Sequence, residues 1–282
     1  MRVLCWNVAH NPQIWSALEV LREQEGFDIA LLQEVARPTA LPTGVSLHPD
    51  PNASGTWETA LHGYPRAWRT AVAWWGDAPV EPIPTGPLHV VAENDDSVLP
   101  ESCPGAFTAV RVGETTLVSF YGVWEHLGPN DQSYSIASVH RSISDLTRLW
   151  FGRSRRPVVI AGDWNVWRAY DAPARSDLRQ WVSRSATVFD RLSAEGLEVA
   201  GPFGSEPLTR CPCGTASSCQ HVQTYWHLHK PDATPYQVDY VVTTKAVRLS
   251  VKPRVITEVG NASLVQQRVS DHCPIVFDLA DS

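Results

Sequence analysis

The chain has 282 residues and a formal net charge of −7, with 23 lysine and arginine residues against 30 aspartate and glutamate residues. This length fits one large α/β domain, and the acidic balance argues against broad, tight binding to a nucleic-acid backbone. No Pro/Gly/Ser-rich linker, low-complexity tract or repeat divides the sequence, so we expect a single domain over residues 1–282.

The first half of the chain is predicted to mix strands with one helix. Residues 13–24 place Ile14, Trp15, Leu18 and Leu21 at a helical period. Apolar runs predict strands at 3–8, 28–35, 71–75, 107–112 and 115–121, with a hairpin turn at Gly113-Glu114. Residues 36–69 are rich in proline, glycine and turn formers and are interpreted as a loop.

The second half is predicted to alternate helices with strands. Helices are expected at 132–150 and 177–195, the latter closed by Gly196. Strands are expected at 156–162, 237–243, 247–252 and 274–279. The chain opens directly on a strand, without a basic and apolar leader, so we expect no signal peptide, no membrane span and a cytoplasmic location.

Polar side chains follow or sit in five of these apolar runs. They are Asn7, Gln33-Glu34, Asp163 with Asn165, Asp239, and Asp271-His272. A strand end holds a side chain rigidly at the rim of a sheet. Carboxylates, amides and an imidazole gathered there indicate a site for a hard metal ion that acts on phosphate esters.

In this order the motifs resemble those of the endonuclease/exonuclease/phosphatase superfamily, which includes deoxyribonucleases, abasic-site endonucleases, sphingomyelinases and inositol-phosphate phosphatases. The resemblance covers the whole chain. It implies an α/β fold, a four-layer α-β-β-α sandwich of two mixed sheets with helices outside. The alternation of helices and strands independently favours two packed sheets.

The resemblance also implies a cation site for Mg²⁺ or Mn²⁺. Glu34 is similar to the principal metal ligand of the superfamily, whereas Asn7 is similar to the amide that supports the metal and the phosphate. Asp271 is expected near the metal. Taken on its own, Glu34 would be interpreted as a solvated residue at a strand end.

Roles in catalysis come from the same resemblance. Asp163 is expected to orient or deprotonate the attacking water, or to protonate the leaving oxygen, and Asn165 to donate to a phosphate oxygen. His272 is expected to contact the phosphate while Asp239 fixes its tautomer. The spacing of Asp163 and Asn165 fits either a continuing strand or an Asx turn that leaves it.

Tyr121 stands where the abasic-site branch has a tyrosine, so its phenol is expected to donate to the phosphate; a core aromatic and an imidazole from His126 are the alternatives. Ala9 departs from that branch, which usually has a carboxylate or amide two residues after the asparagine. Thr224-Tyr225-Trp226 and Tyr236 resemble the aromatic wall that the branch places beside its sugar pocket.

A separate signal comes from the cysteines. Cys211, Cys213, Cys219 and His221 lie within eleven residues and offer four soft or borderline ligands for a structural Zn²⁺. Free thiols or a disulfide are the alternatives. Cys5, Cys103 and Cys273 are interpreted as small core residues.

Three functions are compatible with these patterns. The first is a metal-dependent phosphodiester hydrolase, a nuclease acting on DNA or RNA. The second is a phosphatase or a lipid or small-molecule phosphodiesterase on the same scaffold, which the acidic balance suits. The third, a binding protein with a dead site, is disfavoured because the motif residues all occur together. The sequence carries no signal for the oligomeric state.

Overall fold

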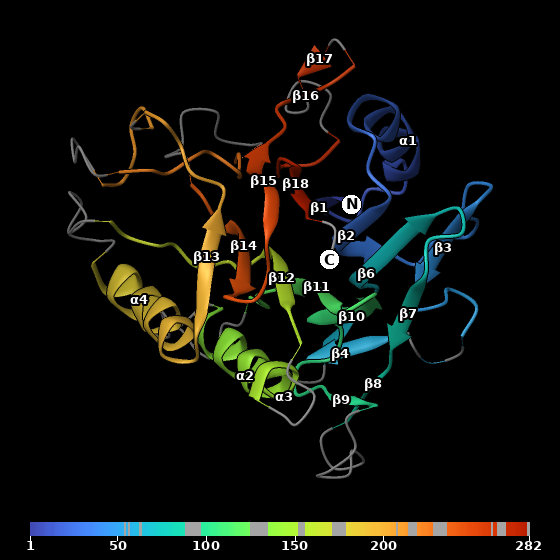
Figure 1. Cartoon of the computed structure of the whole chain (residues 1–282), viewed down its shortest axis with the longest axis horizontal. Helices are drawn as coiled ribbons and strands as arrows, with labels where there is room; N and C mark the ends of the chain where they lie inside the picture. Colours follow the sequence, from blue (N-terminus) through green and yellow to red (C-terminus); the bar gives the residue numbers. More distant parts are fainter. Residues whose placement is uncertain are drawn as a thin grey trace.

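Two packed six-stranded sheets form the centre of the protein, with helices on both outer faces (Figure 1). The computed structural model describes residues 1–53, 55, 57–61, 64–87, 97–124, 135–151, 156–170, 179–206, 208–213, 219–227, 236–260, 262–263 and 269–280.

Sheet I joins the two ends of the chain. Its strands, in spatial order, are β15 (Leu249–Val255), β18 (Ile275–Leu279), β1 (Arg2–Asn7), β2 (Ile29–Ala36), β6 (Trp68–Trp75) and β3 (Val45–His48). β1 pairs with β2 in parallel and with β18 antiparallel. The last strand therefore returns the C-terminal motif to the side of the first strand.

Sheet II holds the central part of the chain. Its strands, in spatial order, are β13 (Leu197–Gly201), β14 (Asp239–Thr244), β12 (Val158–Asp163), β11 (Thr115–Tyr121), β10 (Phe107–Val112) and β7 (Val80–Ile83). β11 and β12 are parallel, whereas β12 and β14 are antiparallel. Both sheets are thus mixed, as predicted.

The alternation of side chains along the strands builds three apolar layers. In β1, Val3 and Cys5 face the cluster between the sheets, whereas Leu4 and Trp6 face the outer side of sheet I. Successive residues of a strand point to opposite faces, so one buried strand supplies two cores. A strand covered on both faces reads as a continuous apolar run.

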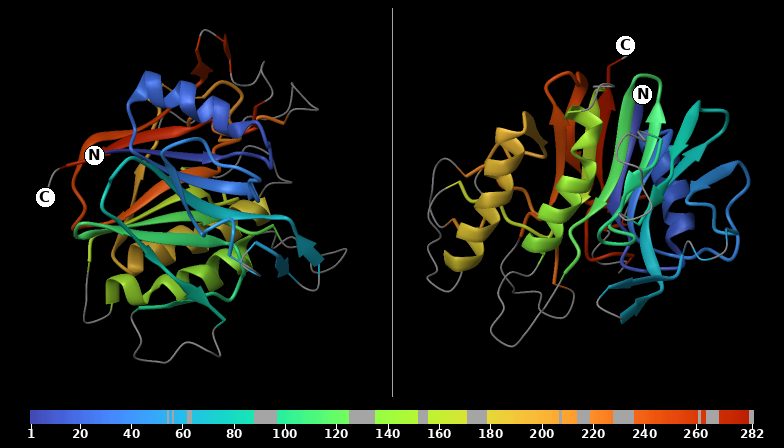
Figure 2. Two further views of the ribbon diagram at one scale, coloured as in Figure 1. Left: turned by 90° about the vertical axis from the view of Figure 1, so that its right-hand side faces the viewer. Right: turned by 90° about the horizontal axis from the view of Figure 1, so that it is seen from below.

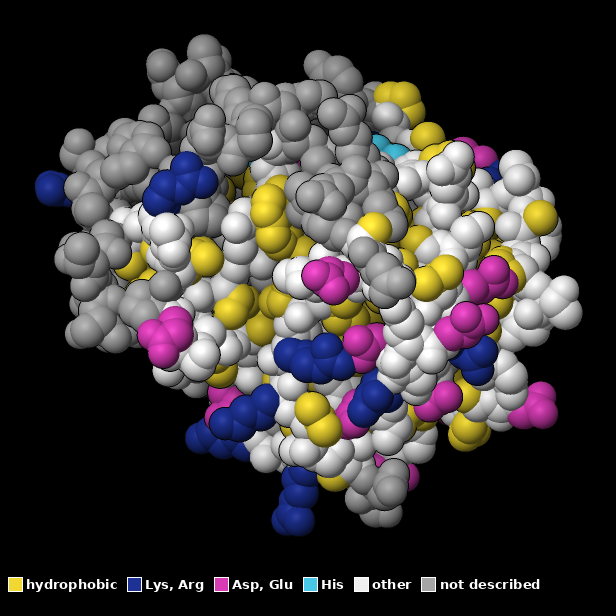
Figure 3. Space-filling view, turned by 90° about the horizontal axis from the view of Figure 1, so that it is seen from above, with side chains coloured by type: hydrophobic (Ala, Val, Ile, Leu, Met, Phe, Trp, Pro, Cys, Tyr) yellow, Lys and Arg dark blue, Asp and Glu magenta, His cyan; other side chains and the backbone are white. Residues whose placement is uncertain are grey.

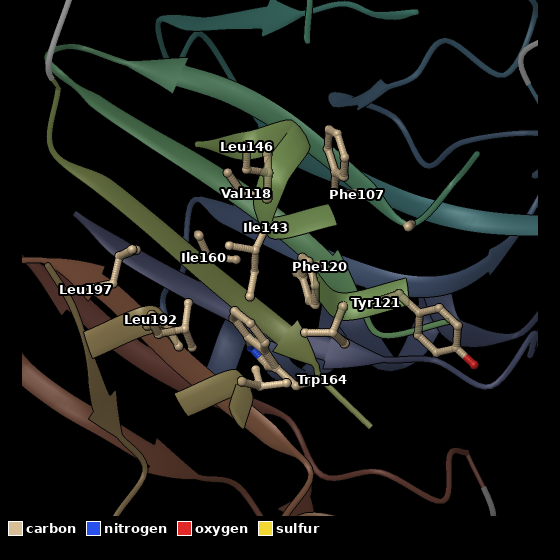
Figure 4. Packing of buried hydrophobic residues seen from close by; sticks show 14 of the residues in the cluster. Phe107, Val118, Phe120, Tyr121, Ile143, Leu146, Ile160, Trp164, Leu192 and Leu197 are labelled. Carbon is tan, nitrogen blue, oxygen red and sulfur yellow. The ribbon is translucent and has the colours of Figure 1, made fainter. Parts of the chain in front are cut away.

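Helices cover the outer faces. On sheet I lies α1 (Ile14–Glu25), whereas α2 (Ile136–Leu146), α3 (Arg148–Phe151) and α4 (Arg179–Ala194) lie on sheet II, as Figure 2 shows from two sides. Ile143 and Leu146 of α2 pack against Val118, Phe120 and Ile160 of sheet II (Figure 4). The predicted four-layer sandwich is confirmed. Among the described residues, no helix is long and apolar enough to cross a membrane.

The helix boundaries differ slightly from prediction. The expected helix at 132–150 is divided into α2 and α3, and its residues 132–134 lie outside the described part of the chain. The helix predicted at 177–195 is α4, followed by Gly196 at a φ of 82°. Glycine adopts this left-handed conformation without steric cost, which is why it ends a helix well.

The loop prediction for residues 36–69 is wrong in part. The segment contains β3, β4 (Thr59–Leu61), β5 (Tyr64–Arg66) and the start of β6. β3 is a four-residue edge strand with half-exposed residues, and β4 pairs only with β5. Short edge strands need few apolar residues, so their pairing has little sequence signal.

Other short strands also lacked a prediction. They are β7, β8 (Thr85–Gly86), β9 (Leu99–Pro100), β13, β16 (Glu258–Val259) and β17 (Ala262–Ser263). The strands predicted at 107–112 and 115–121 are β10 and β11, and they pair antiparallel across Gly113-Glu114. The predicted hairpin is therefore confirmed.

Candidate active site

A cavity of about 700 Å³ opens where strands of both sheets end. Its lining includes six residues that the sequence predicted for the site: Glu34, Tyr121, Asp163, Asn165, Asp271 and His272. The strand register explains much of this convergence. Asp163 pairs with Tyr121 on one neighbouring strand and with Asp239 on the other, and paired residues present their side chains on the same face.

His272 lies between two carboxylates. Its Nδ1 is 2.9 Å from Asp239 Oδ2, and its Nε2 is 3.7 Å from Asp163 Oδ2. All three residues are buried. His272 reaches this position because its carbonyl accepts a hydrogen bond from the Trp6 indole at 2.9 Å, next to the end of β1.

Asp163 is held by amide donors. Its Oδ1 accepts from the Asn165 backbone N–H at 2.9 Å, which is the Asx turn that the spacing allowed, so the strand does not continue. Its Oδ2 accepts from the side-chain amides of Asn165 and Asn7, at 3.1 and 3.0 Å. A side chain at Gly162 would lie 1.8 Å from the Phe120 carbonyl, so only glycine lets β12 approach β11 here.

Glu34 receives two contacts at the end of sheet I. Its Oε1 accepts from the Asn7 amide at 3.2 Å, and its Oε2 lies 2.8 Å from His10 Nε2. Asn7 Oδ1 accepts from the Ala9 N–H at 3.0 Å. Asn7 thus links Glu34 to Asp163, and through them it links the two sheets.

Burial and charge shift the proton affinities of these groups. Burial raises the pKa of Asp163 to about 8, helped by the Asp239 and Glu34 carboxylates. Burial lowers the pKa of His272, but Asp239 and Asp163 outweigh it and raise that pKa to about 10. For Glu34, burial opposes ionisation, yet the hydrogen bond and charge of His10 hold its pKa below the ordinary value.

Tyr121 belongs to both the core and the cavity. Its ring packs edge-on against Trp68 at 5.0 Å, and in Figure 4 its hydroxyl points away from Phe120 and Trp164. Burial, followed by the nearby Glu34 and Asp163 charges, raises the pKa of Tyr121 well above its ordinary value. The phenol therefore keeps its proton and can donate a hydrogen bond. His126, the alternative donor, lies outside the described residues.

The backbone around the cavity adopts an uncommon conformation. Ala9, His10, Glu34 and Asn165 have φ angles of 48°, 58°, 53° and 50°. This left-handed conformation is energetically unfavourable for most non-glycine residues, and residues that adopt it cluster at functional sites. All four line the cavity.

Aromatic side chains form part of the cavity wall: Trp124, Trp181, Tyr225 and Tyr236. Tyr225 pairs with Tyr236 and with His272 through isolated β-bridges, and its ring lies 5.0 Å from the His272 ring. The predicted aromatic segment thus borders the cavity through Tyr225 and Tyr236, whereas Trp226 packs against the outer core of sheet I.

Comparison with known proteins decides the family. The sequence profile of the Endonuclease/Exonuclease/phosphatase family matches residues 4–272. The chain belongs to this family. This match confirms the predicted superfamily. Members of the family are hydrolases that act on phosphoester bonds. No curated protein sequence matches the chain.

Solved structures of other family members share the fold. An AP endonuclease from Archaeoglobus fulgidus is 14% identical, with a TM-score of 0.65 and 100% of both chains covered. An AP endonuclease from Leishmania major is 16% identical, with a TM-score of 0.67, covering 100% of this chain and 88% of that one. A 3′ phosphatase from Neisseria, bound to a product DNA hairpin, is 16% identical with a TM-score of 0.62 and full coverage of both.

Two residues that line the cavity, Trp181 and His10, lacked a sequence prediction. His10 is half-exposed, contacts Glu34 and stacks on Trp68 at 4.9 Å. It follows Ala9, where the abasic-site branch usually carries a carboxylate or amide. The sequence signal for His10 was limited to its position three residues after Asn7. Periodicity does not predict the left-handed turn at Ala9 and His10, which places the His10 ring beside Glu34.

The predicted cysteine cluster lies apart from the cavity. The ligand atoms of Cys211, Cys213, Cys219 and His221 all lie within 4.8 Å of one another, and all four residues are buried. None of them lines the cavity. Cys5, Cys103 and Cys273 are buried within the apolar clusters of the core, as predicted.

Proposed function

We propose that this phosphoester hydrolase is a divalent-cation-dependent nuclease that cleaves phosphodiester bonds of DNA or RNA within a single domain. The main support is the Asp239–His272–Asp163 arrangement, in which His272 and Asp163 line one cavity with Glu34, Tyr121 and the exposed Trp124. A cluster of acidic residues alone would not indicate a nuclease. Here groups that can transfer protons lie beside aromatic rings on which bases can stack, and this combination favours a nuclease.

The donors in the cavity fit Mg²⁺ or Mn²⁺. Glu34 has a lowered pKa and stays ionised at neutral pH, and Asp271 brings a second carboxylate to the same cavity. Hard cations prefer such oxygen ligands. When bound, the cation neutralises charge on the phosphate and in the transition state. Asn7 donates hydrogen bonds to Glu34 and Asp163 and holds both carboxylates in place, and we propose its amide oxygen as a further ligand.

Asp163, His272 and Tyr121 act on different reactants: Asp163 on the attacking water, and His272 and Tyr121 on the phosphate. We infer that Asp163, in its ionised form, accepts a proton from the water that attacks phosphorus, because the carboxylate lines the cavity beside His272 and its raised pKa lets it take up a proton near neutral pH. Asp239 holds the His272 ring, whose positive charge contacts a phosphate oxygen. Tyr121 donates to another phosphate oxygen. The bond from phosphorus to the 3′ oxygen breaks, and solvent protonates that oxygen.

The aromatic walls favour a nucleotide substrate. Trp124 is 50% exposed at the cavity, unlike the fully buried Trp164 and Trp167. A sugar or base can stack on such a ring whatever its sequence. The similar endonucleases and the DNA-bound Neisseria phosphatase add support by analogy of fold.

Surface charge indicates that binding depends on the cavity and its rim. Acidic and basic side chains are interspersed on the face shown in Figure 3, and the net charge is −7. A protein that neutralises few phosphates loses little affinity as salt increases. We therefore expect a shallow salt dependence of nucleic-acid binding, and we propose a cytoplasmic location in keeping with the free thiols.

The test is a substrate panel with pure protein and either Mg²⁺ or Mn²⁺. Single- and double-stranded DNA and RNA, a 3′-phosphorylated oligonucleotide, inositol phosphates and sphingomyelin are each incubated with the wild type and with Asp163→Asn. Cleavage of a polynucleotide that the variant loses supports the proposal. Hydrolysis of only the lipid or small phosphoesters would establish the alternative phosphodiesterase or phosphatase instead.

A further inference from the structure

The cluster of Cys211, Cys213, Cys219 and His221 has the geometry of a closed metal site. The Sγ atoms of the three cysteines lie 3.3, 3.6 and 3.3 Å from His221 Nδ1, and the Sγ atoms of Cys211 and Cys219 are 3.5 Å apart. With Zn–S near 2.3 Å and Zn–N near 2.0 Å, a tetrahedral Zn²⁺ requires ligand separations of roughly 3.5–3.8 Å. The observed separations are close to these.

We propose that these four residues bind one structural Zn²⁺, distinct from the catalytic cation. Three thiolates and one imidazole are soft or borderline donors, which select zinc over magnesium. The site is closed, because the exposed fractions of the four residues are only 6, 5, 3 and 1%. A closed four-ligand site of this kind leaves no position for substrate and is typical of structural zinc.

Hydrogen bonding alone does not account for the arrangement. A neutral imidazole with its proton on Nε2 has one lone pair on Nδ1, which can accept from a single thiol. Here three sulfur atoms surround that one nitrogen. A disulfide does not account for it either, since the bond requires about 2.05 Å between sulfurs. A central cation satisfies all four ligands at once.

Contacts around His221 orient its imidazole ring so that Nδ1 faces the three sulfur atoms. Its Nε2 contacts the Arg168 carbonyl oxygen, which only accepts, so the ring proton lies on Nε2 and Nδ1 is free to face the sulfurs. The Trp167 ring stacks on the imidazole at 5.1 Å, and the Tyr170 ring packs edge-on at 4.8 Å. These contacts fix the ring orientation and exclude water.

The zinc site would join two segments that border the cavity. His221 contacts Arg168 in the segment that follows Asp163 and Asn165. Three residues after His221, the Thr224 hydroxyl accepts from the Val238 and Asp239 backbone N–H groups. Tyr225, next in sequence, packs against His272. Bound zinc would therefore hold the aromatic wall and the Asp163 segment in register, a consequence that rests on the proposed function.

Elemental analysis of the full-length protein, purified without a histidine tag, is the direct test. We expect about one zinc per chain in the wild type and in the control Cys103→Ser, whose cysteine is buried outside the cluster. Cys219→Ser and His221→Ala should lose most of it. Less than a tenth of an equivalent in the wild type would overturn the proposal, and so would full retention in both cluster variants.

Two further measurements cover variants that fold poorly and separate this proposal from the nuclease assignment. Wild-type protein grown with Co²⁺ should show the intense visible absorption of tetrahedral cobalt–thiolate coordination; its absence would overturn the ligand set. Removal of zinc from the wild type should speed amide hydrogen exchange in residues 219–227, and unchanged exchange would overturn the stabilising role. Neither readout depends on phosphoester hydrolysis, so failure of the nuclease assay leaves both interpretable.

Discussion

The candidate active-site cavity and the Cys211/Cys213/Cys219/His221 cluster both gather side chains of the types that bind metals, but they differ in donor atoms and in access to solvent. The cavity holds carboxylates and opens to solvent, whereas the cluster holds sulfur and nitrogen and is closed. An open oxygen-rich site leaves room for water and substrate, and a closed sulfur-rich site does not. This difference in donors and access is the reason why we propose a catalytic role for the first site and a stabilising role for the second.

A large loss of activity is expected from Glu34→Gln. The change removes the ionised carboxylate at the cavity while keeping its shape, so turnover should fall by at least about 10²-fold. The melting temperature and the zinc content should stay close to wild type, as they should in the exposed control Glu19→Gln, which should also keep full activity. Steady-state kinetics and elemental analysis of the same preparations provide the check; zinc loss in Glu34→Gln would break the separation of the two sites.

Asp163→Asn and His272→Ala should each lower kcat by about 10²- to 10⁴-fold, with a small change in KM, because the residues act on protons and charge in the transition state. The two groups lie 3.7 Å apart and serve one step, so the double variant should be little slower than the worse single variant. A full double-variant cycle measures this. Additive losses would mean that the two residues act in separate steps.

Asp239→Asn should lower the pKa of His272, which is about 10 in the intact site. The Asp239 carboxylate stabilises the imidazolium, so its removal shifts the titration toward the ordinary value near 6.5. Imidazole NMR of the metal-free protein follows this directly, with Asp278→Asn on the distant face of sheet I as the control. An unchanged His272 titration would show that Asp239 does not stabilise the charged ring.

Trp124→Ala tests whether the exposed rim of the cavity binds nucleotides. Stacking of a base on an aromatic ring contributes about 1–3 kcal/mol, so KM for an oligonucleotide should increase by about 10-fold. Turnover of bis-(p-nitrophenyl) phosphate, which lacks bases and sugars, should change little. Phe151→Ala is a matched control, because Phe151 is 52% exposed on α3 and does not line the cavity. Equal effects of both variants would argue against stacking at Trp124.

The sequence predicted the long central strands because their residues are buried on both faces and form continuous apolar runs, as in β2 and β12. Glu34, Asp163 and His272 each lie at or near the end of an apolar run. Because the ends of neighbouring strands meet at one rim of a sheet, these three residues were predicted to lie together. Edge strands were missed for the opposite reason. β3 and β7 are half-exposed and depend on partners far along the chain, which no local pattern encodes.

His10 shows the same limit within the site. Its place beside Glu34 depends on left-handed backbone at Ala9, His10 and Glu34, and alanine and glutamate have no intrinsic preference for this conformation. The local Ala9 N–H bond to Asn7 Oδ1 stabilises the turn, together with two tertiary contacts: the His10 N–H bond to the Glu34 carbonyl and the stacking of His10 on Trp68. Such turns become visible only once the surrounding strands are in place.

The smallest expected effect in the cavity is that of His10→Ala. His10 Nε2 lies 2.8 Å from Glu34 Oε2, and the ring is otherwise half-exposed, so we expect it to orient the carboxylate. Loss of a group that orients a metal ligand typically weakens metal binding by about 10-fold. Titration of zinc-loaded protein with Mn²⁺, followed by electron paramagnetic resonance, should detect this weakening, while kcat at saturating Mn²⁺ stays within a few-fold of wild type. His10→Asn, which keeps a donor at this position, should recover part of the affinity. Tighter Mn²⁺ binding by His10→Ala would instead mean that the imidazole competes with the cation for Glu34. The open site would then contain an internal competitor for its cation, which the closed cysteine cluster does not.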